Sequence, residues 1–198
     1  MFDTPKKTIN FAQTVNQVSQ VAQNAKRFLL SALVLMIVGM TIFFFGYFTK
    51  YENRTDGWSL YYPRGWEVKE ELDAGGIVVF LAKKQSPLDF FQDNISITYT
   101  KMRTPITIEE YPELTKKQMT ETLSDVRASD ASMVNISGHR AAKMIFQAAG
   151  DIKLTFVVYA FLVDDVAYNI TYAGMTEHYE KSGRYIFDIV MATLRVMF

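Results

Sequence analysis

The chain divides into two stretches that differ in their pattern of hydrophobic and polar residues. Residues 28–49 form an apolar run without a charged side chain. As a helix, these 22 residues rise about 33 Å, matching the roughly 30 Å hydrocarbon layer of a bilayer. A buried helix of a soluble core would be shorter and polar on one side. A cleaved signal peptide would have an apolar region of about 7–15 residues and a small-residue cleavage site, which this run lacks. The pattern predicts an uncleaved transmembrane helix.

Residues 1–27 are polar overall, but their apolar positions alternate by spacings of four and three, as in a helix packed along a seam. The same register continues into the apolar run, where small residues let a second backbone approach closely. Chance is the alternative explanation, because glycine and alanine are common in membrane helices. We predict a nearly continuous helix from about residue 8 to 49, amphipathic over 1–27 and membrane-spanning over 28–49. The residues predicted to contact a partner helix are Phe11, Val18, Ala25, Ala32, Gly39 and Gly46.

The charges are distributed unevenly, although the formal net charge is zero. Residues 1–50 contain five basic side chains and one acidic one, which leaves 16 basic and 20 acidic side chains in residues 51–198. The positive-inside rule then places the N-terminus in the cytoplasm and the larger part in the periplasm or its equivalent, with the thylakoid lumen as an alternative compartment. A mildly acidic domain excludes nucleic acid as the expected partner.

Residues 58–198 show short alternating runs separated by turn residues, after a polar stretch over 50–57 that reads as a linker. Thr107 is the predicted cap of the first helix. Strands joined mostly as hairpins, together with two helices, predict an α+β fold in which an antiparallel sheet is flanked by helices. The predicted strands are 58–63, 66–71, 76–83, 94–102, 126–136, 139–148, 153–163 and 166–174, and the predicted helices are 107–123 and 177–194.

A series of short motifs resembles the PsbP-like family, beginning with a "Y-P-x-x-W" element at Tyr62–Trp66. The resemblance covers about residues 56–198, and its weight lies in the order of the motifs, since each motif alone is weak. The further matching segments are Phe80-Leu81-Ala82, Asn94-Ile95-Ser96-Ile97, Thr107-Ile108-Glu109-Glu110-Tyr111, Asn135–Ala141, Phe156–Val163, Ala167–Thr171 and Met191-Ala192-Thr193-Leu194.

The resemblance implies a central antiparallel sheet between helices, a PsbP-like α/β/α sandwich. The family includes photosystem II PsbP, bacterial envelope lipoproteins and a nuclear Ran-binding protein, which are mostly binding or accessory proteins rather than enzymes. This chain departs from many bacterial members, because it has no lipoprotein cysteine and carries a transmembrane segment instead. A specific partner therefore does not carry over from the family.

No set of residues in the sequence predicts catalysis, a cofactor or a metal. There is no cysteine, and the two histidines, His139 before a predicted strand and His178 in the first turn of the last helix, would both have to be stretched to build a hydrolytic triad or a histidine-rich metal site. Asp164-Asp165 reads as a turn, because a calcium site needs more oxygen ligands than two adjacent acids supply.

An apolar trio, Leu88, Phe90 and Phe91, lies in a predicted loop between acidic residues. Either these side chains tuck under the sheet, or they form an exposed patch that binds a partner. We predict that Leu88, Phe90 and Phe91 bind a partner.

The leading hypothesis is a single-pass accessory or assembly subunit whose partners are integral membrane proteins of a larger complex, within the lipid bilayer. The alternative is a stand-alone envelope protein that binds a small molecule or lipid in a cavity lined by Phe80, Phe146, Phe156 and Tyr168. An enzyme is the third reading, and it would require a cleft that gathers carboxylates with raised pKa values.

Overall fold

The computed structural model describes residues 11–71, 76–84, 90–123 and 125–196, with side chains described from residue 25 onward. The chain forms two compact units, Met1–Tyr47 and Phe48–Phe198. Among the described residues, the first unit contributes one helix and the second contributes all the strands.

Helix α1 spans Phe11–Tyr47, so the structure confirms a long uninterrupted helix. Its segment Ala25–Tyr47, 23 residues, is long and apolar enough to cross a membrane, and none of its most apolar part is buried. The hydroxyls of Ser31 and Thr41 donate to backbone carbonyls four residues earlier, at 3.0 Å and 2.8 Å. Both hydroxyl donors are therefore satisfied within the helix, which a lipid environment without water would require.

The predicted linker over residues 50–57 is instead part of the folded unit. Strand β1 (Phe48–Asn53) pairs antiparallel with β2 (Trp58–Pro63), and the side chains of Phe48 and Asn53 are buried. The linker prediction, and the inclusion of Phe48 in the membrane segment, were wrong. A short polar run with weak alternation gives little local signal, whereas pairing with β2 satisfies its backbone groups.

The remaining residues of this unit build a large antiparallel sheet. Its strands are β3 (Glu67–Glu71), β4 (Ile77–Leu81), β5 (Asn94–Lys101), β6 (Val126–Ala128), β7 (Ser132–Ile136), β8 (His139–Ala149), β9 (Lys153–Val163) and β10 (Val166–Met175). Their order is β3-β4-β5-β10-β9-β8-β6, with β7 also paired to β8, and each pair is antiparallel. The predicted strands over 58–102 and 139–174 are confirmed to within a few residues.

The segment 126–136, predicted as one strand, forms the two strands β6 and β7. At Ser129 the backbone N–H donates to the carbonyl of Ile145 at 2.8 Å, while the Ser129 hydroxyl accepts from the Ile145 N–H at 3.0 Å. A side chain here replaces a backbone group of the ladder, so the strand is interrupted although its hydrophobic pattern continues.

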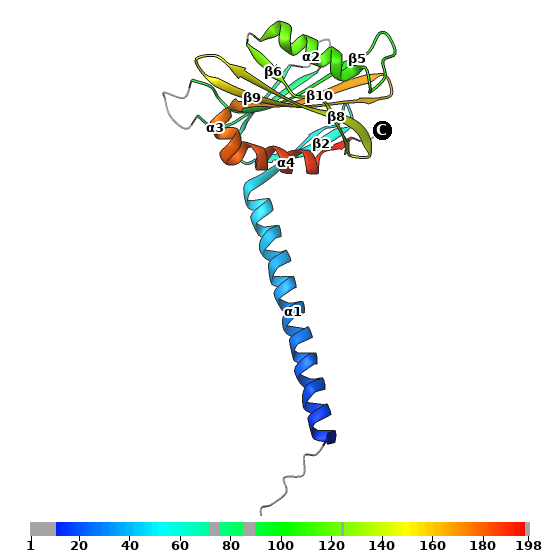
Figure 1. Ribbon diagram of the computed structural model, residues 1–198, viewed down its shortest axis with the longest axis vertical. Helices are drawn as coiled ribbons and strands as arrows, with labels where there is room; N and C mark the ends of the chain where they lie inside the picture. Colours follow the sequence, from blue (N-terminus) through cyan, green and yellow to red (C-terminus); the bar gives the residue numbers. More distant parts are fainter. Residues whose placement is uncertain (1–10, 72–75, 85–89, 124, 197–198) are drawn as a thin grey trace, which may run out of the picture. The chain divides into compact units, whose positions relative to one another are not determined.

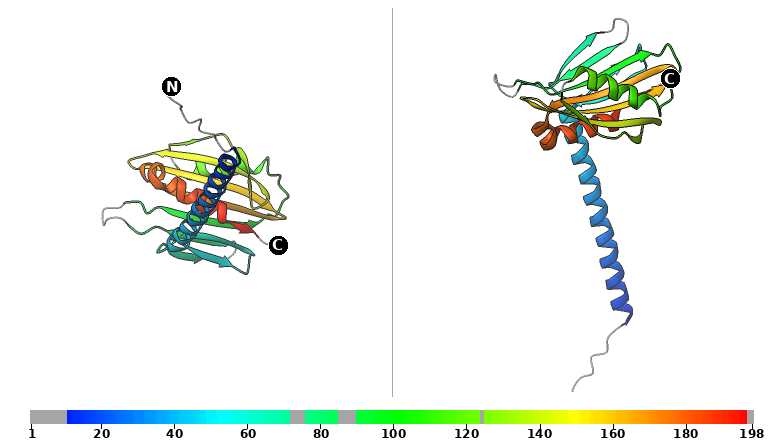
Figure 2. Two further views of the ribbon diagram at one scale, coloured as in Figure 1. Left: turned by 90° about the horizontal axis from the view of Figure 1, so that it is seen from below. Right: turned by 45° about the horizontal axis from the view of Figure 1, so that its top comes forward.

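Each face of the large sheet is covered by a separate layer (Figure 1). Helix α2 (Tyr111–Thr122) lies over one face, as the second view also shows (Figure 2, right). Helix α4 (Arg184–Thr193) and the small sheet β1-β2-β11, in which β11 is Arg195–Val196, cover the other. The structure confirms the α+β class, an antiparallel sheet flanked by helices.

Two hydrophobic cores result, one on each face of the sheet. The core beneath α2 contains Tyr111, Met144, Phe146, Val158, Ala160 and Ala167. The larger core beneath α4 and the small sheet contains, among others, Trp58, Phe80, Tyr168, Tyr172, Phe187 and Val190.

Helix α2 begins later than the predicted 107–123. Thr107 lies in a separate turn, where its hydroxyl accepts from the Glu110 N–H at 3.3 Å and the Glu110 carboxylate accepts from the Thr107 N–H at 3.1 Å. This is the reciprocal pattern of a capping box. Thr107 therefore caps the turn that leads into α2, and the helix proper starts at Tyr111.

The closing helix, predicted over 177–194, contains an irregular turn. It runs as α3 (Thr176–His178), a π-helical segment η1 (Tyr179–Gly183) and α4. A π turn shifts the phase of the residues that follow it. The buried face of α4 is consequently Phe187, Val190 and Met191, whereas Tyr179, Ile186 and Ile189 are only partly buried.

Candidate functional site

The small residues predicted to contact a partner lie on one side of α1. Ala25, Ala32, Gly39 and Gly46 are all exposed, and a β-carbon at Gly39 or Gly46 would meet nothing within 4 Å. At seven-residue intervals, successive positions differ by only about 20° around the helix. Phe11 and Val18 belong to the same helix, but their side chains lie outside the described residues. The seam stays a prediction, since large apolar side chains all round this segment are exposed as well.

The apolar loop trio does not form one uniform patch. The Phe90 side chain is 82% exposed, Phe91 is partly buried, and Leu88 lies outside the described residues. The exposure of Phe90 agrees with the interpretation that this residue binds a partner. The partial burial of Phe91 agrees with the alternative, in which the loop packs inward.

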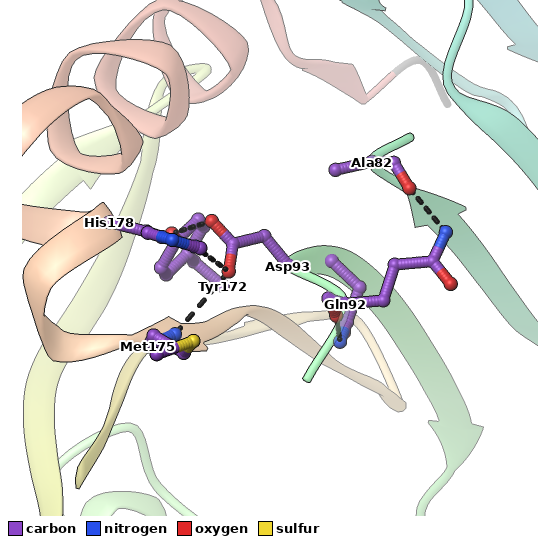
Figure 3. Close-up of polar contacts among 7 residues, drawn as sticks. Ala82, Gln92, Asp93, Tyr172, Met175 and His178 are labelled. Carbon is purple, nitrogen blue, oxygen red and sulfur yellow. Dashed lines mark hydrogen bonds and ion pairs between the residues drawn. The ribbon is translucent and has the colours of Figure 1, made fainter. Parts of the chain in front are cut away.

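Asp93 anchors the end of this loop to the closing helix (Figure 3). Its carboxylate accepts hydrogen bonds from the Tyr172 hydroxyl at 2.9 Å, the Met175 N–H at 3.3 Å and His178 Nδ1 at 3.2 Å. The neighbouring Gln92 side chain donates to the carbonyl of Ala82 at the end of β4. Phe90 is therefore presented next to a firmly attached segment.

The hydroxyl of Tyr172 lies between Gly174 and Gly183, two residues that have no side chain. A β-carbon at Gly174 or at Gly183 would overlap the Tyr172 hydroxyl. Tyr172 is fully buried, and burial together with the Asp93 carboxylate raises the pKa of its hydroxyl above the ordinary value. The hydroxyl consequently remains a hydrogen-bond donor to Asp93.

Beside this cluster lies a cavity of about 240 Å³, formed between the β2–β3 turn, the end of β4 and the π-helical segment. Arg64 and Lys83 line it with positive charge, Ser182 contributes a hydroxyl, and Trp66 and Ile186 contribute apolar surface. The positive φ of +85° at Gly65 places that turn against the Lys83 side chain, whose Cε would lie 3.1 Å from a β-carbon there.

The cavity predicted from Phe80, Phe146, Phe156 and Tyr168 does not form. Phe80 and Tyr168 belong to the core on the α4 face, whereas Phe146 and Phe156 belong to the core beneath α2. Strand alternation places these aromatics on opposite faces of the sheet, and both faces are packed with side chains.

A second polar cluster joins the β1–β2 hairpin to the large sheet. The Tyr99 hydroxyl donates to Asp56 at 2.5 Å, and the Asn53 amide donates to the same carboxylate at 2.9 Å. The Tyr51 hydroxyl donates to Glu70 on β3 at 2.8 Å. Burial, followed by the hydrogen bond to Asp56, raises the pKa of Tyr99 to about 12.

The two histidines have separate local roles. The His139 ring stacks on Phe161 with the ring centres 6.3 Å apart, and His178 contacts Asp93. Within the described residues no three His, Cys, Asp or Glu side chains are placed to hold a metal ion together. The sequence pattern does not predict the Asp93 cluster. Asp93 follows the apolar trio closely, but its partner Tyr172 is 79 positions further along the chain, so no local pattern connects them.

No family model matches this sequence, and no curated protein matches it. Solved structures do match. They include cyanobacterial PsbP (CyanoP) from Synechocystis sp. PCC 6803, with a TM-score of 0.55 and 15% identity over 76% of this chain and 92% of that one. LpqN of Mycobacterium tuberculosis, described as involved in cell envelope biogenesis, matches with a TM-score of 0.58 and 12% identity over 76% of this chain and 91% of that one.

A third similar structure is the Ran-binding protein Mog1p of Saccharomyces cerevisiae, with a TM-score of 0.53 and 11% identity over 75% of this chain and 95% of that one. Identities this low establish a shared fold and carry no function with them. The strands and helices observed in Phe48–Phe198 agree with the order of motifs from which the resemblance was drawn. The folded unit of this chain has a PsbP-like fold.

Proposed function

We propose that this chain is a single-pass membrane protein that acts as an accessory or assembly subunit of a membrane complex. Helix α1 crosses the bilayer through Ala25–Tyr47 and packs against an integral membrane partner, while the PsbP-like unit binds partner proteins outside the cytoplasm. The observation that carries this proposal is an exposed apolar segment of 23 residues that continues, without a break, into a polar helical extension with seam-like spacing. A helix that served only as an anchor would need no such extension.

The distribution of charge supports an N-terminus in the cytoplasm. Lys26 and Arg27 precede most of the apolar segment and form no ion pair within the described residues. On the other side, Lys50 and Arg54 both pair with Glu52, at 3.1 Å and 3.2 Å. Four basic residues, Lys6, Lys7, Lys26 and Arg27, thus precede most of the apolar segment and two follow it closely, and the positive-inside rule assigns the side with more Lys and Arg to the cytoplasm.

The loop residue Phe90 supports a second contact, made by the folded unit. A large aromatic side chain that is 82% exposed has no role in the core, and the hydrogen bonds of Asp93 and Gln92 hold the residues that follow it. Aromatic anchors on ordered segments lose little conformational entropy on binding, so they often dominate interface energies.

Solubilisation in a mild detergent, followed by affinity purification and mass spectrometry, tests the proposal. Native protein should retain at least one integral membrane partner. Gly39→Leu combined with Gly46→Leu should release it, because the larger side chains prevent close approach of the backbones. Phe90→Ser should weaken partner retention without lowering the thermal stability of the folded unit.

The matched control for the helix is Val34→Leu combined with Val38→Leu. Val34 lies two residues after Ala32, and hence about 200° around the helix, so this variant adds bulk away from the stripe. Partner loss that is equal in both double variants would contradict the stripe as the contact. A native protein that elutes as a monomer with no partner would contradict the accessory role itself.

A further inference from the structure

The large sheet has edge strands of equal length that differ in charge. Strand β3, at one edge, spans Glu67–Glu71 and carries four charged side chains among its five residues. Strand β7 spans Ser132–Ile136, lies beside β8 at the same edge as β6, and carries no charged side chain. We propose that β7 pairs antiparallel with β7 of a second copy of this chain, so that two large sheets join into one across a twofold axis.

The edge at β7 lacks the protection that β3 has. Charged side chains protect an edge strand, because pairing with another strand would desolvate them or place like charges together. On β7, Met133 is instead a large apolar side chain that is 41% exposed, and Ser132 and Asn135 are exposed and uncharged. Within the described residues, β8 is the only strand that pairs with β7. The other side of β7 is therefore available to a second strand.

The turn that joins β7 to β8 fixes which backbone groups of β7 point outward. Ile136 pairs with His139 across the two-residue turn Ser137-Gly138, in which both residues have positive φ, 52° and 89°. This is the conformation of a type I′ hairpin, whose closing residues exchange both backbone hydrogen bonds. Because hydrogen-bonded and non-hydrogen-bonded pairs alternate along the strands, the N–H and C=O groups of Met133 and Asn135 point away from β8.

These outward groups are arranged for pairing with a copy of the same strand. When Met133 lies opposite Asn135 of the copy, Asn135 lies opposite Met133 of the copy, and each pair exchanges two backbone hydrogen bonds. Val134 then faces its own counterpart on the axis, and Ser132 faces Ile136. No residue of β7 is charged, so no like charges meet across the contact. The strand is thus complementary to itself, which favours a second copy over an unrelated segment.

The anchor helix is compatible with this twofold arrangement. The axis that relates two antiparallel neighbours is perpendicular to the sheet, so both copies have their α4 faces on the same side. Strand β1 belongs to the layer on that face, and its first residue, Phe48, follows directly on Tyr47 at the end of α1. Both chains therefore enter the combined sheet from one side, as two copies in one bilayer require.

Anchoring in a shared membrane also supplies the concentration that a small contact needs. Five residues from each copy form a smaller contact than the roughly 1,200–2,000 Å² of stable interfaces in solution. Confinement to one bilayer raises the effective concentration of the second copy. Strand pairing thus rests on the proposed membrane anchor, but not on the small-residue seam of α1.

Disulfide cross-linking in isolated membranes tests the pairing, because the sequence contains no other cysteine. In Val134→Cys the two substituted residues face each other in a non-hydrogen-bonded pair, with Cα atoms about 4.5 Å apart, which suits a disulfide. Copper phenanthroline in air should convert the 22.7 kDa chain to a product of twice that mass. The native chain should give no such product.

Ser132→Cys is the matched control, since Ser132 is exposed and lies on the same strand and the same face as Val134. In the proposed register Ser132 faces position 136 of the copy, so the two substituted residues are about 13 Å apart along the strands. A disulfide cannot span that distance, and Val134→Cys should therefore cross-link at least about five-fold more.

Met133→Pro, added to Val134→Cys, tests whether backbone hydrogen bonds make the contact. Proline removes the outward N–H of residue 133 and is compatible with pairing to β8, as at other edge strands. Cross-linking should fall about ten-fold, as expected for the loss of one hydrogen bond on each side of the axis. Met133→Leu, added to Val134→Cys, keeps the N–H and should leave the yield unchanged. Circular dichroism checks the folding of both variants, and the comparison of positions 132 and 134 needs neither of them.

The inference would be overturned by the absence of a cross-linked dimer, by equal yields at positions 132 and 134, or by an undiminished yield in the folded proline variant. A product that contains another protein, identified by mass spectrometry, would equally contradict a second copy as the occupant.

Gly39→Leu combined with Gly46→Leu, added to Val134→Cys, separates strand pairing from the helix seam. The cross-link should persist in this variant, and its loss would show that the helices hold the copies together. A chain that cross-links at position 134 but retains no integral membrane partner would contradict the accessory role and leave the strand pairing supported.

Discussion

Tyr172 links three parts of the chain through a single side chain. Its ring packs in the larger core with Phe187, 5.8 Å between ring centres, and its hydroxyl reaches Asp93 at the end of the loop. Gly174 and Gly183 leave the space that the hydroxyl occupies. These glycines are therefore needed for close approach, and substitution at either should disturb both the core and the loop.

Gly183→Ala should destabilise the folded unit. Alanine favours a helix over glycine by about 1 kcal/mol, but overlap with a fully buried tyrosine costs more, so we expect a net loss of about 2 kcal/mol. Urea denaturation of the full chain in detergent, followed by circular dichroism, measures the change.

Gly150→Ala is the control for that prediction. Gly150 lies in a hairpin turn, and a β-carbon there would come no closer than 4.0 Å to the Ile152 carbonyl oxygen. The free energy of unfolding should change by less than about 0.5 kcal/mol. Equal stability of the two glycine variants would show that Tyr172 can move aside.

Among the elements, β1 has the least local signal in the sequence, yet the hairpin that it forms with β2 is attached to the large sheet by specific polar contacts. Two tyrosines join it to the large sheet, Tyr51 on β1 through Glu70 and Tyr99 on β5 through Asp56. The burial of Asn53 completes the second cluster. Polar side chains thus hold a segment that its sequence pattern suggests is a linker.

The Tyr99 contact makes stability depend on alkaline pH. Its pKa in the folded state is about 12, above the ordinary value of 10.0, so the folded protein keeps this proton where the unfolded chain releases it. The contribution of the Tyr99 hydroxyl to the free energy of unfolding is complete below about pH 10 and is lost as the pH rises through about 12. Tyr99→Phe should cost about 1 kcal/mol near pH 8, and the gap to the native protein should close between those values.

Urea denaturation of both proteins at a series of pH values checks this prediction. The informative quantity is the difference in unfolding free energy between the native protein and Tyr99→Phe, because other titrating groups contribute to both proteins and cancel. A difference that stays constant up to pH 12 would exclude Tyr99 as the group responsible.

On the scale of the whole molecule, the two units are built by different rules. The described side chains of α1 are nearly all exposed and apolar, whereas the unit Phe48–Phe198 buries its apolar side chains on both faces of a sheet. This contrast is explained if lipid surrounds one unit and water the other.

The absence of cysteine from the sequence allows a direct test of membrane orientation. Single cysteines introduced as Thr8→Cys and Glu121→Cys should differ in reactivity toward a membrane-impermeant maleimide in intact cells or right-side-out vesicles. We expect labelling only at position 121, because the proposed orientation places the N-terminus in the cytoplasm. The reverse pattern would refute the proposed orientation, and labelling of both would refute a transmembrane anchor.

The sequence by itself determined the long helix, most of the strands and the fold resemblance, because each depends on local periodicity or on the order of short motifs. The continuous apolar run predicts α1, and alternation predicts the hairpins from β8 to β10. These signals act between residues that are neighbours along the chain.

Only the tertiary structure decided which side chains meet. Asp93, Tyr172 and His178 converge because β5 pairs with β10 in one register and because the closing helix returns over the sheet with a π turn. The tertiary structure also decided the place of β1, which depends on pairing with β2. It likewise put Phe80 and Tyr168 on one face of the sheet and Phe146 and Phe156 on the other. Such contacts depend on register and helix phase, and a shift of one residue in either would abolish them.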